Sequence, residues 1–203
     1  MKFQLFLKRQ MDFWASLIIL IILSPLFLII AVLIKLDSKG PVLFFQKRAG
    51  KDGKIFKIWK FRTMVKNAEK TGLGLRVSEN DLRITNIGRF LRRFGIDELP
   101  QLKNIIFGEM SIVGPRAALV HQAAQYTDFE KQRLAVRPGV ANINMIKGWN
   151  TLPWKKRIEW DIWYINHWSL WLDLKILIKT PMIVLSGKGQ YGEAGIVEDY
   201  NNK

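Results

Sequence analysis

Residues 13–34 have the sequence FWASLIILIILSPLFLIIAVLI. No charged residue interrupts this run, and only Ser16, Ser24 and Pro25 depart from its aliphatic and aromatic character. At about 1.5 Å per helical residue, such a run can reach across a hydrocarbon core of roughly 30 Å. We therefore predict a membrane segment. A cleaved signal peptide is disfavoured because the run is too long and no small-residue cleavage site follows it.

Basic residues on both flanks bear on how this segment lies in the membrane. Lys2, Lys8 and Arg9 precede it, and Lys35, Lys39, Lys47 and Arg48 follow it. Because basic flanks favour the cytoplasm, a straight span would place one of them on the unfavourable side. A helix that enters the bilayer and returns removes this conflict.

Pro25 supplies the break that a returning helix needs. Proline has no backbone N–H donor and disfavours the helical conformation at Ser24, whose hydroxyl could satisfy a freed carbonyl. We expect residues 1–39 to form a reentrant membrane helix broken at Ser24 and Pro25. The alternative is an ordinary span with a proline kink, since prolines are common in transmembrane helices.

Composition limits the remaining possibilities. The chain has 203 residues with 32 Lys and Arg against 17 Asp and Glu, so its formal net charge of +15 implies an anionic partner. Hydrophobic residues make up 49%, which is enough for a folded core. The lack of cysteine excludes disulfides, thiolate zinc sites and iron–sulfur clusters. The two histidines, His121 and His167, exclude a multi-histidine metal site and disfavour a serine triad.

Residues 40–186 predict a small mixed domain, followed by a loosely held tail at 187–203. We expect strands at 42–46 and 54–62, then helices at 86–93 with Asn86 as N-cap, 97–107, 117–126 and 129–134, a loop at 137–139, a helix from Trp154, and a last helix from Ser169 to Gly187.

A tryptophan cluster suggests that part of this domain lies at a membrane surface. Its members are Trp149, Trp154, Trp160, Trp163, Trp168 and Trp171. Together with Lys155, Lys156 and Arg157, they are typical of an amphipathic helix at the headgroup level. The alternative for any one of them is simple packing in a core.

Asp97 and Glu98 are the strongest candidates for chemistry. They stand at an expected helix start beside Arg89, Arg92 and Arg93, and both features should keep a carboxylate ionised. An ionised aspartate can attack phosphorus if nearby arginines and a divalent cation offset the repulsion between anions. A site of hard oxygen ligands favours Mg²⁺ over zinc. The alternative is that Asp97 only caps its helix.

Basic side chains could supply phosphate recognition. They are dense at 47–66, where Lys47, Arg48, Lys51, Lys54, Lys57, Lys60, Arg62 and Lys66 face a single acid, Asp52. Arg116 follows the turn Gly114–Pro115 at an expected strand exit. The ligand could be a lipid headgroup, a nucleotide or a nucleic acid, and many of these residues could equally be solvated or lie against anionic lipid.

Several segments also match one family in order. They are Ser24 with Pro25, GPVLFFQ at 40–46, FKIWKFRTM at 56–64, RITNIGRFLRR at 83–93, DELPQL at 97–102, GEMSIVGPR at 108–116, VRPGV at 136–140 and SLWLDLKILIKT at 169–180. In this set the chain resembles the monotopic phosphoglycosyl transferases, also called bacterial sugar transferases, which begin glycan assembly on a polyprenyl phosphate.

The resemblance implies an activity and a setting. A sugar 1-phosphate would pass from a UDP-sugar to undecaprenyl phosphate with release of UMP, starting a capsule, exopolysaccharide or lipopolysaccharide. The fold would be a small cytoplasmic α/β domain with an N-terminal reentrant membrane helix and interfacial amphipathic helices. The protein would lie on the cytoplasmic face of the bacterial inner membrane, and its oligomeric state is left open.

The resemblance also assigns site residues. Asp97 would attack the β-phosphorus and form a phosphosugar aspartyl intermediate, and Glu98 with Asp97 would bind Mg²⁺. The remaining expected substrate-binding residues are Lys60 and Arg92 near phosphate, Arg116 near the nucleotide, and Arg62, Arg137 and Asp161. Asp173 matches a family aspartate without an assigned role.

One segment departs from the family pattern. After the loop at 137–139 many members have Ile, Thr and Gly, then a Gln and a Gly-Arg, whereas this chain has Val140, Ala141, Asn142, Met145, Gly148 and Trp149. Trp149 lacks the guanidinium group of an arginine, which could bind substrate. The identity of the donor sugar is therefore left open. Ala117, where proline is frequent, should matter little.

Two other functions remain open at this point. The altered segment at 141–149 makes a noncatalytic membrane-surface adaptor conceivable. Charge and aromatic residues alone suggest a membrane-tethered nucleic-acid binder, which no recognised nucleic-acid motif supports, so we expect no nucleic-acid partner.

Overall fold

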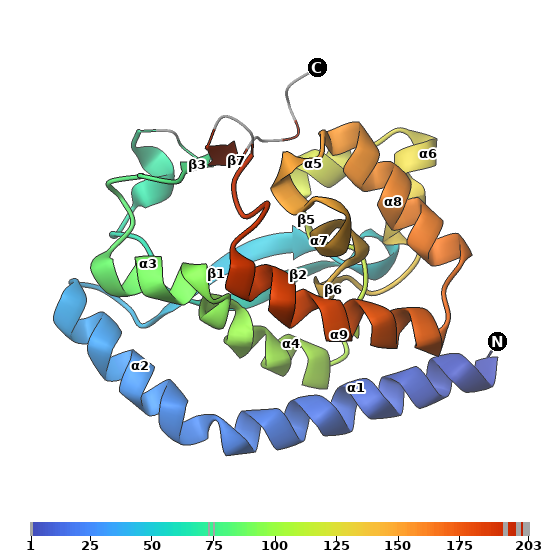
Figure 1. Cartoon of the computed structure of the whole chain (residues 1–203), viewed down its shortest axis with the longest axis horizontal. Helices are drawn as coiled ribbons and strands as arrows, with labels where there is room; N and C mark the ends of the chain where they lie inside the picture. The colour runs from blue at the N-terminus through green and yellow to red at the C-terminus, as the bar shows by residue number, and fades with distance from the viewer. Residues whose placement is uncertain (1, 73, 75, 193–194, 198–199, 201–203) are drawn as a thin grey trace.

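A computed structural model describes residues 2–72, 74, 76–192, 195–197 and 200. Figure 1 shows a mixed domain of helices and short sheets above a long, bent pair of N-terminal helices. The expected α/β class is therefore confirmed.

The element bounds are as follows. The helices are α1 (Lys2–Ile22), α2 (Ser24–Asp37), α3 (Asn86–Arg93), α4 (Leu102–Ile106), α5 (Val120–Ala124), α6 (Asp128–Lys131), α7 (Ile143–Lys147), α8 (Trp154–Asn166) and α9 (Leu170–Ser186). The strands are β1 (Leu43–Ala49), β2 (Ile55–Phe61), β3 (Val77–Ser78), β4 (Ser111–Val113), β5 (Ala118–Leu119), β6 (Gly139–Ala141) and β7 (Ile196–Val197). Short 3-10 helices are η1 (Lys51–Gly53), η2 (Ala68–Lys70), η3 (Ile96–Gln101), η4 (Gln132–Leu134) and η5 (Trp149–Thr151).

The break between α1 and α2 lies where the sequence predicts it. In a continuous helix the N–H of Pro25 would pair with the carbonyl of Ile21, but proline has no such donor. The Ser24 hydroxyl donates to that carbonyl at 2.8 Å instead. The two helices are bent by 61° at the break. Within the described ranges, no helix by itself has the length and apolar character needed to cross a membrane, whereas α1 and α2 taken together do.

The first half of α1 is bound to the domain by charged side chains. Arg9 donates to the carbonyls of Ile105 and Ile106 at 2.6 and 2.8 Å, which satisfies the C-terminal end of α4. Lys8 pairs with Asp173 of α9 at 2.6 Å. Asp12 accepts hydrogen bonds from the Ser111 hydroxyl at 2.7 Å and from the backbone N–H of Ile112 at 3.2 Å. Lys8 and Arg9 are thus domain contacts as well as basic flanks.

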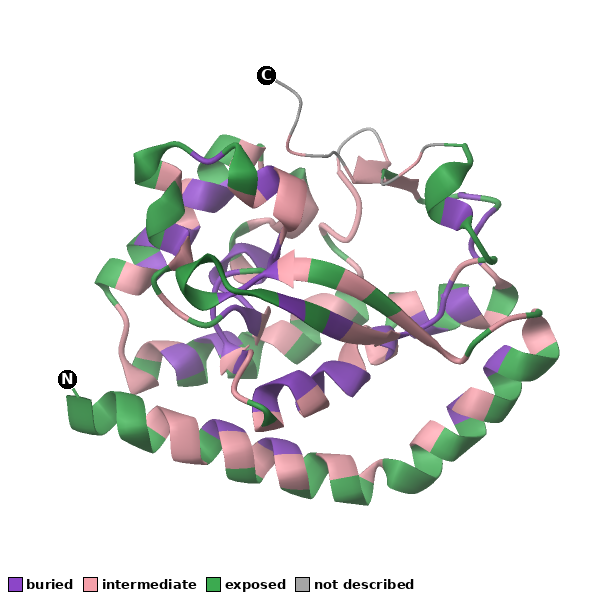
Figure 2. Cartoon of the chain, turned by 180° about the vertical axis from the view of Figure 1, so that it is seen from behind, coloured by how far each residue is buried: buried purple, intermediate pink, exposed green. Residues whose placement is uncertain are grey.

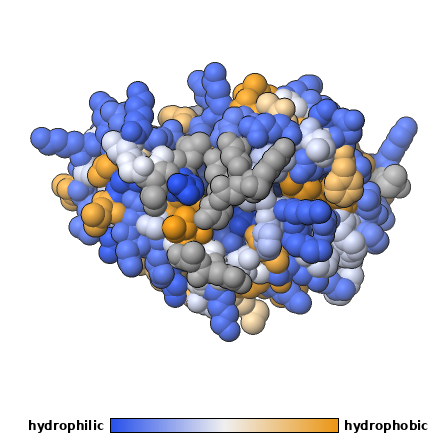
Figure 3. Space-filling view, turned by 90° about the horizontal axis from the view of Figure 1, so that it is seen from above, coloured by the Kyte–Doolittle hydropathy of each residue, from blue (hydrophilic) through white to orange (hydrophobic). Residues whose placement is uncertain are grey.

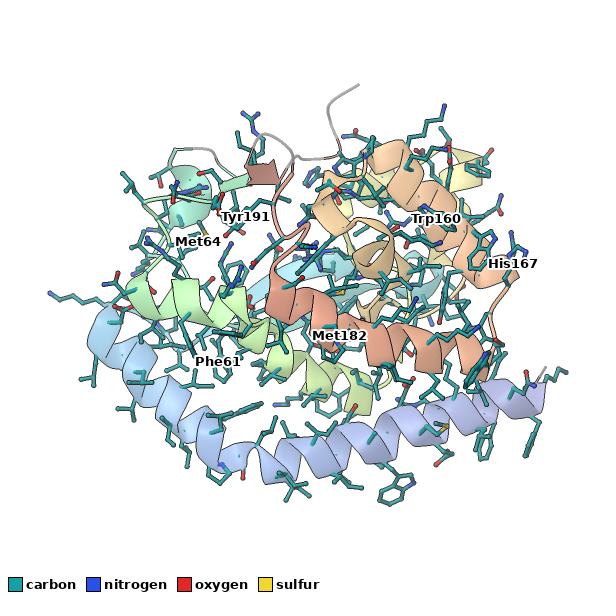
Figure 4. The ribbon with its side chains drawn as sticks, in the orientation of Figure 1. Phe61, Met64, Trp160, His167, Met182 and Tyr191 are labelled. Atoms are coloured by element: carbon teal, nitrogen blue, oxygen red, sulfur yellow. The ribbon has the colours of Figure 1, made fainter. Side chains whose placement is uncertain are left out.

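The far end of α2 is bound to the same domain. The Arg62 guanidinium donates to the carbonyls of Ser38 and Lys39 at 2.8 and 2.6 Å, just beyond the last turn of α2. Asp37 accepts from the backbone N–H of Ile87 in α3 at 3.0 Å. Behind these contacts, Ile30, Ile34, Phe61 and Leu91 form a buried cluster, and Figure 4 labels Phe61 between α2 and α3.

The largest sheet is the hairpin of β1 and β2, with β5 on the other edge of β1. Leu43 pairs with Phe61 and Ala49 with Ile55, so side chains alternate between two faces. Phe56 and Ile58 point inward and pack with Leu102 and Ile105. The opposite face, seen from behind in Figure 2, is largely uncovered.

A second layer is built around the parallel pair β4 and β6. Val113 and Ala141 of these strands pack with Ile143 of α7, Tyr164 of α8 and Ile176 of α9. Arg116 follows β4 after Gly114 and Pro115, at the strand exit that the sequence predicts.

Several predicted boundaries are wrong. Residues 97–107 divide into the 3-10 helix η3, which contains Pro100, and α4, because proline cannot donate within a regular helix. Residues 117–126 begin as strand β5, which pairs with β1 before α5 starts. Thr85 caps α3 rather than Asn86, its hydroxyl accepting from the N–H of Gly88. Gly139 belongs to β6 and not to a loop.

The described tail residues contact the domain, which the sequence does not predict. β7 pairs antiparallel with β3, and the Gln190 amide donates to the Arg92 carbonyl at 2.8 Å. Residues 193–194, 198–199 and 201–203 of the predicted tail lie outside the described residues.

The tryptophan prediction needs a correction as well. Trp160 and Trp168 pack against the core around Tyr164, and Arg157 is buried rather than interfacial. The exposed apolar stripe is on α9 instead, where Trp171, Leu174, Ile178, Met182 and Leu185 recur at helical spacing. Figure 4 labels Met182 on this helix, which runs close to α1 in Figure 1.

Candidate active site

Two glycines position the acidic pair. A Cβ on Gly88 would lie 2.0 Å from the Thr63 carbonyl oxygen, so only glycine lets α3 lie directly on the chain that leaves β2. Gly95 has φ +66°, a left-handed conformation that ends α3 and redirects the chain into η3. Asp97 and Glu98 follow in the first turn of η3.

Lys60, Glu98 and Arg116 meet from three separate elements. Lys60 is near the end of β2, on the face that packs toward η3, and its Nζ lies 2.6 Å from Glu98 Oε1. An Arg116 guanidinium nitrogen lies 3.5 Å from the same oxygen. Arg92 of α3 is fixed by a hydrogen bond of 2.7 Å from its Nε to the Thr63 hydroxyl.

Asp97 is more buried than the sequence suggests, with 9% of its surface exposed. Burial raises its pKa above the ordinary value, Lys60, Arg92 and Arg116 act in the opposite direction, and the charge of Glu98 adds to the rise. The sequence analysis considers only the neighbouring cations and the helix start, and the structure adds burial as the largest influence on the Asp97 pKa.

At Glu98 the neighbouring cations have the larger combined effect on the pKa. Burial is the largest influence and would raise its pKa, but Lys60, Arg116 and Arg48 together outweigh it and lower the pKa to about 2. The two adjacent carboxyl groups therefore have opposite electrostatic preferences, an arrangement typical of paired catalytic acids.

These groups line one cavity of about 650 Å³. The predicted site residues that border it are Lys60, Arg62, Arg92, Asp97, Glu98 and Arg116. The volume lies in the range of small-molecule sites, and charged groups converge on one part of the wall. Residues from β2, α3, η3 and the exit of β4, which the resemblance assigns to one site, thus border the same cavity.

Three predicted substrate-binding residues have other contacts. The Arg62 guanidinium is engaged at the end of α2. Arg137 lies outside the cavity lining, and its Nε donates to the Gly108 carbonyl at 2.6 Å. Asp161 is fully buried behind the lining, where it accepts from Arg133 and from the Asn144 amide.

Several cavity residues have no individual site role in the sequence analysis, which names Arg48 only among the dense basic residues at 47–66 and Arg157 only beside the tryptophan cluster. Arg48 donates to the Ala117 carbonyl at 2.9 Å, and burial together with nearby Arg116 lowers its pKa to about 10. Strand alternation could have placed Arg48 on the inward face with Gln46. The others are Arg133, Asn150, Arg157, Gln190 and Tyr191, which no local motif marks.

The carboxylate pair can be tested for a fit to magnesium. Over the part of the chain that the structure describes, no group of three or more Asp, Glu or His side chains could hold a metal ion alone. Mg²⁺ is commonly bound by one or two carboxylates together with substrate phosphates. Asp97 and Glu98 supply hard oxygen ligands of this kind, so they fit an ion that binds with a diphosphate.

The family model described as bacterial sugar transferase matches residues 3–187. The chain belongs to the bacterial sugar transferase family. The matched range ends at Gly187, the C-cap of α9.

Curated relatives of this bacterial sugar transferase match nearly all of this chain, but the matched part is a different share of each relative's own length. A UDP-glucose:undecaprenyl-phosphate glucose-1-phosphate transferase of Klebsiella pneumoniae is 44% identical over 194 residues, covering 91% of this chain but 41% of the relative. A UDP-N-acetylgalactosamine-undecaprenyl-phosphate N-acetylgalactosaminephosphotransferase of Aeromonas hydrophila is 41% identical, with 91% and 45% covered. The uncharacterized sugar transferase EpsL of Bacillus subtilis is 39% identical, with 90% and 89% covered. The chain thus spans less than half of the first two relatives.

Proposed function

We propose that this chain transfers a sugar 1-phosphate from a UDP-sugar to undecaprenyl phosphate, with Asp97 as the nucleophile. The observation that carries the proposal is the cavity where buried Asp97 lies beside Glu98, Lys60, Arg92 and Arg116. The printed activities of the Klebsiella and Aeromonas relatives support the same class of reaction.

The reaction proceeds in two displacements. An Asp97 carboxylate oxygen forms a bond to the β-phosphorus, while the bond from that phosphorus to the bridging oxygen breaks and UMP leaves with the electron pair. A phosphate oxygen of undecaprenyl phosphate then attacks the same phosphorus, and Asp97 departs as a carboxylate. Dividing the transfer lets one site serve a soluble and a lipid substrate in turn.

The surrounding residues make the first displacement feasible. Burial raises the Asp97 pKa, and the positive charges of Lys60, Arg92 and Arg116 counteract this rise by favouring the ionised carboxylate. Lys60 and Arg92 supply such charge next to the diphosphate, and Arg116 extends it toward the nucleotide. Glu98, ionised at any ordinary pH, holds Lys60 and Arg116 in place.

Magnesium is part of the proposal. Glu98 and Asp97 would hold Mg²⁺, which when bound offsets the negative charge of the diphosphate. We expect chelation of divalent ions to stop UMP release and added Mg²⁺ to restore it. Glu98→Gln should raise the Mg²⁺ concentration needed for half-maximal turnover. Full activity of the chelated enzyme would contradict this assignment.

We further propose that α1 and α2 form a reentrant membrane helix rather than a span. Lys8 and Asp12 bind α1 to the domain, and Asp37 with Arg62 binds the end of α2 to the same domain. Two ends fixed to one folded body lie on one side of the bilayer. Around the bend the exposed residues Ile21, Ile22, Leu26, Leu28 and Ile29 are apolar. The hydroxyl of Ser24, which is also exposed, is bonded to the Ile21 carbonyl.

We also propose a place on the cytoplasmic face of the inner membrane, which the basic residues on both flanks of the membrane segment support. The apolar stripe of α9 and Phe107 after α4 would lie against the lipid headgroups. The face opposite α1 and α2 is mostly hydrophilic, as Figure 3 shows. Undecaprenyl phosphate would then reach the cavity along the membrane side, past Thr180 and Val184 of α9.

UMP release by purified protein tests the activity. We expect turnover with at least one UDP-sugar when undecaprenyl phosphate is present, and a loss of roughly a thousandfold or more in Asp97→Asn. Asp128→Asn, on the exposed start of α6, is the control and should match the wild type. Mass spectrometry of enzyme trapped without acceptor should find the phosphosugar on Asp97. Undiminished turnover by Asp97→Asn would refute the assignment.

The noncatalytic adaptor is not favoured, because Asp97, Glu98, Lys60 and Arg92 are all present around an open cavity. Absence of UMP release across a broad UDP-sugar panel would revive it.

A further inference from the structure

The described tail crosses the side of the cavity. We call residues 188–192 and 195–197 the strap. They follow the range matched by the family model, which ends at residue 187. Figure 1 shows the chain rising from the end of α9, past the sheet, to β7 beside β3. Gln190, Tyr191 and Val197 of the strap line the same cavity as Asp97.

One end of the strap is fastened to η5. The backbone N–H of Asn150 donates to the Gly189 carbonyl at 2.9 Å, and its side-chain amide donates to the Gln190 carbonyl at 2.7 Å. Gly189 has φ +74°, and a Cβ there would lie 2.6 Å from the Gly148 carbonyl oxygen. This close approach makes glycine necessary at the crossing.

The strap then reaches the opposite wall. Gln190 Nε2 donates to the Arg92 carbonyl at 2.8 Å, directly connecting the strap to the helix that carries a candidate phosphate ligand. Further on, β7 pairs with β3, and the N–H of Glu79 donates to the Gly195 carbonyl at 2.9 Å. The strap therefore joins two walls that are far apart in the sequence.

Trp149 completes this part of the wall. It has φ +53°, an uncommon conformation for a bulky residue, and its Cβ would lie 3.0 Å from a Cβ on Gly189 of the strap. Such backbone strain persists only where surrounding contacts fix it, and it is often found at ligand sites. Trp149 borders the cavity together with Tyr191, which Figure 4 labels beside Met64.

The chemistry of this wall differs from that of the Asp97 region. Lys60, Arg92 and Arg116 are cations suited to phosphate, whereas Trp149, Gln190 and Tyr191 are neutral. An amide and a phenol exchange hydrogen bonds with hydroxyl groups, and aromatic rings cover an apolar face. Burial raises the pKa of Tyr191, so its phenol keeps its proton at neutral pH.

We propose that the strap selects the sugar of the donor, with Gln190 and Tyr191 as specificity-determining residues packed beside Trp149. This inference rests on the proposed function, because it assumes that a UDP-sugar places its β-phosphorus at Asp97. The sugar attached to that phosphorus would then occupy the cavity that the uncharged side chains of Trp149, Gln190 and Tyr191 line.

The test compares Gln190→Ala and Tyr191→Phe with the matched control Lys188→Ala, an exposed strap residue outside the cavity lining. UMP release is measured with UDP-glucose, UDP-galactose, UDP-N-acetylglucosamine and UDP-N-acetylgalactosamine, and equilibrium binding is measured for each donor and for UDP. We expect the ratios among donors to change by roughly tenfold or more in the two variants. UDP affinity should stay at the wild-type value, and Lys188→Ala should match the wild type throughout.

Two results would overturn the inference. One is an unchanged ratio among donors in both variants. The other is an equal loss of affinity for UDP and every donor, which would mean that the strap only supports the cavity. If wild-type protein releases no UMP from any donor, the proposed function fails, but the binding ratios still decide whether the strap discriminates between sugars.

Discussion

Asp97 and Glu98 are neighbours in the chain, yet their carboxyl groups differ in role and surroundings. Glu98 forms ion pairs with Lys60 and Arg116, and its pKa falls to about 2. At Asp97 the effect of burial exceeds that of the neighbouring cations, so its pKa rises. Burial and neighbouring charges thus move the pKa values of two adjacent carboxyl groups in opposite directions.

Asp161 is a positioning residue by its contacts, because it holds Arg133 from behind the cavity lining. We predict that Asp161→Asn lowers the free energy of unfolding by about 3–5 kcal/mol, since it leaves a buried guanidinium without its counter-charge. The measurement is thermal or denaturant unfolding in detergent. Asp128→Asn, whose partner Lys131 is exposed, should leave the transition unchanged. An Asp161→Asn protein of full stability with weakened donor binding would instead favour direct substrate contact.

Asp81 should make the segment bordering the cavity sensitive to acid. Its carboxylate orients the Arg83 guanidinium, which donates to the carbonyls of Ala68, Thr71 and Gly74. The hydrogen bond from Arg83 lowers the Asp81 pKa below 3.8. The stabilisation is therefore complete above that value and is lost as the pH falls through the lower folded value.

We predict that Asp81→Asn destabilises the protein at neutral pH and that its deficit relative to wild type shrinks on acidification. Unfolding midpoints followed from neutral pH to below pH 3.8 provide the check. A deficit that stays constant over this range would exclude titration of Asp81 as the cause.

At the scale of elements, the broken helix pair is the clearest case of local sequence dictating shape. Pro25 removes one donor, Ser24 replaces it, and the bend of 61° follows. Side-chain contacts at both ends, such as Lys8 with Asp173 and Arg62 with the Ser38 carbonyl, then bind the bent pair to the domain. Helix geometry alone permits a kinked span, whereas the attachment of both ends to one body supports the proposed reentrant arrangement.

The chain contains no cysteine, which makes its topology directly testable with single reporters. We predict that Lys2→Cys and Lys39→Cys react with a membrane-impermeant maleimide from the same side of sealed vesicles. Ile22→Cys, at the bend, should stay protected from both sides, and the cysteine-free parent gives the background. Labelling of the two lysine positions from opposite sides would identify a span.

The helix α9 should mark the membrane surface, whereas α8 should not. A dye on Met182→Cys, in the apolar stripe, should shift its emission to shorter wavelength when vesicles are added. The same dye on Lys155→Cys, exposed on α8, should keep its emission in water. Equal responses at both positions would contradict the proposed orientation.

For the whole molecule, sequence patterns predict the parts whose causes are local. The helix break, the hairpin and the cap of α9 by Ser169 follow from proline, alternation and capping. The resemblance adds the grouping of Lys60 and Arg92 with Asp97, which lie in different elements.

What sequence patterns miss depends on distant partners. Arg62 and Lys60 share one strand face, but only the position of α2 shows that the Arg62 guanidinium binds there. Asp161 pairs with Arg133. No local sequence pattern predicts a buried ion pair between residues so far apart in the sequence. The ionisation of Asp97 depends on how much water packing removes. β7 has two residues, too few for an alternation signal.

The attachment of α1 has a consequence for how the protein is made. Lys8 leaves the ribosome before its partner Asp173, which lies 165 residues later in the chain. The apolar stretch therefore emerges well before the groups that will hold it in place exist. During synthesis it must be shielded, by a chaperone or by early contact with lipid, until the last long helix arrives and completes the fastening.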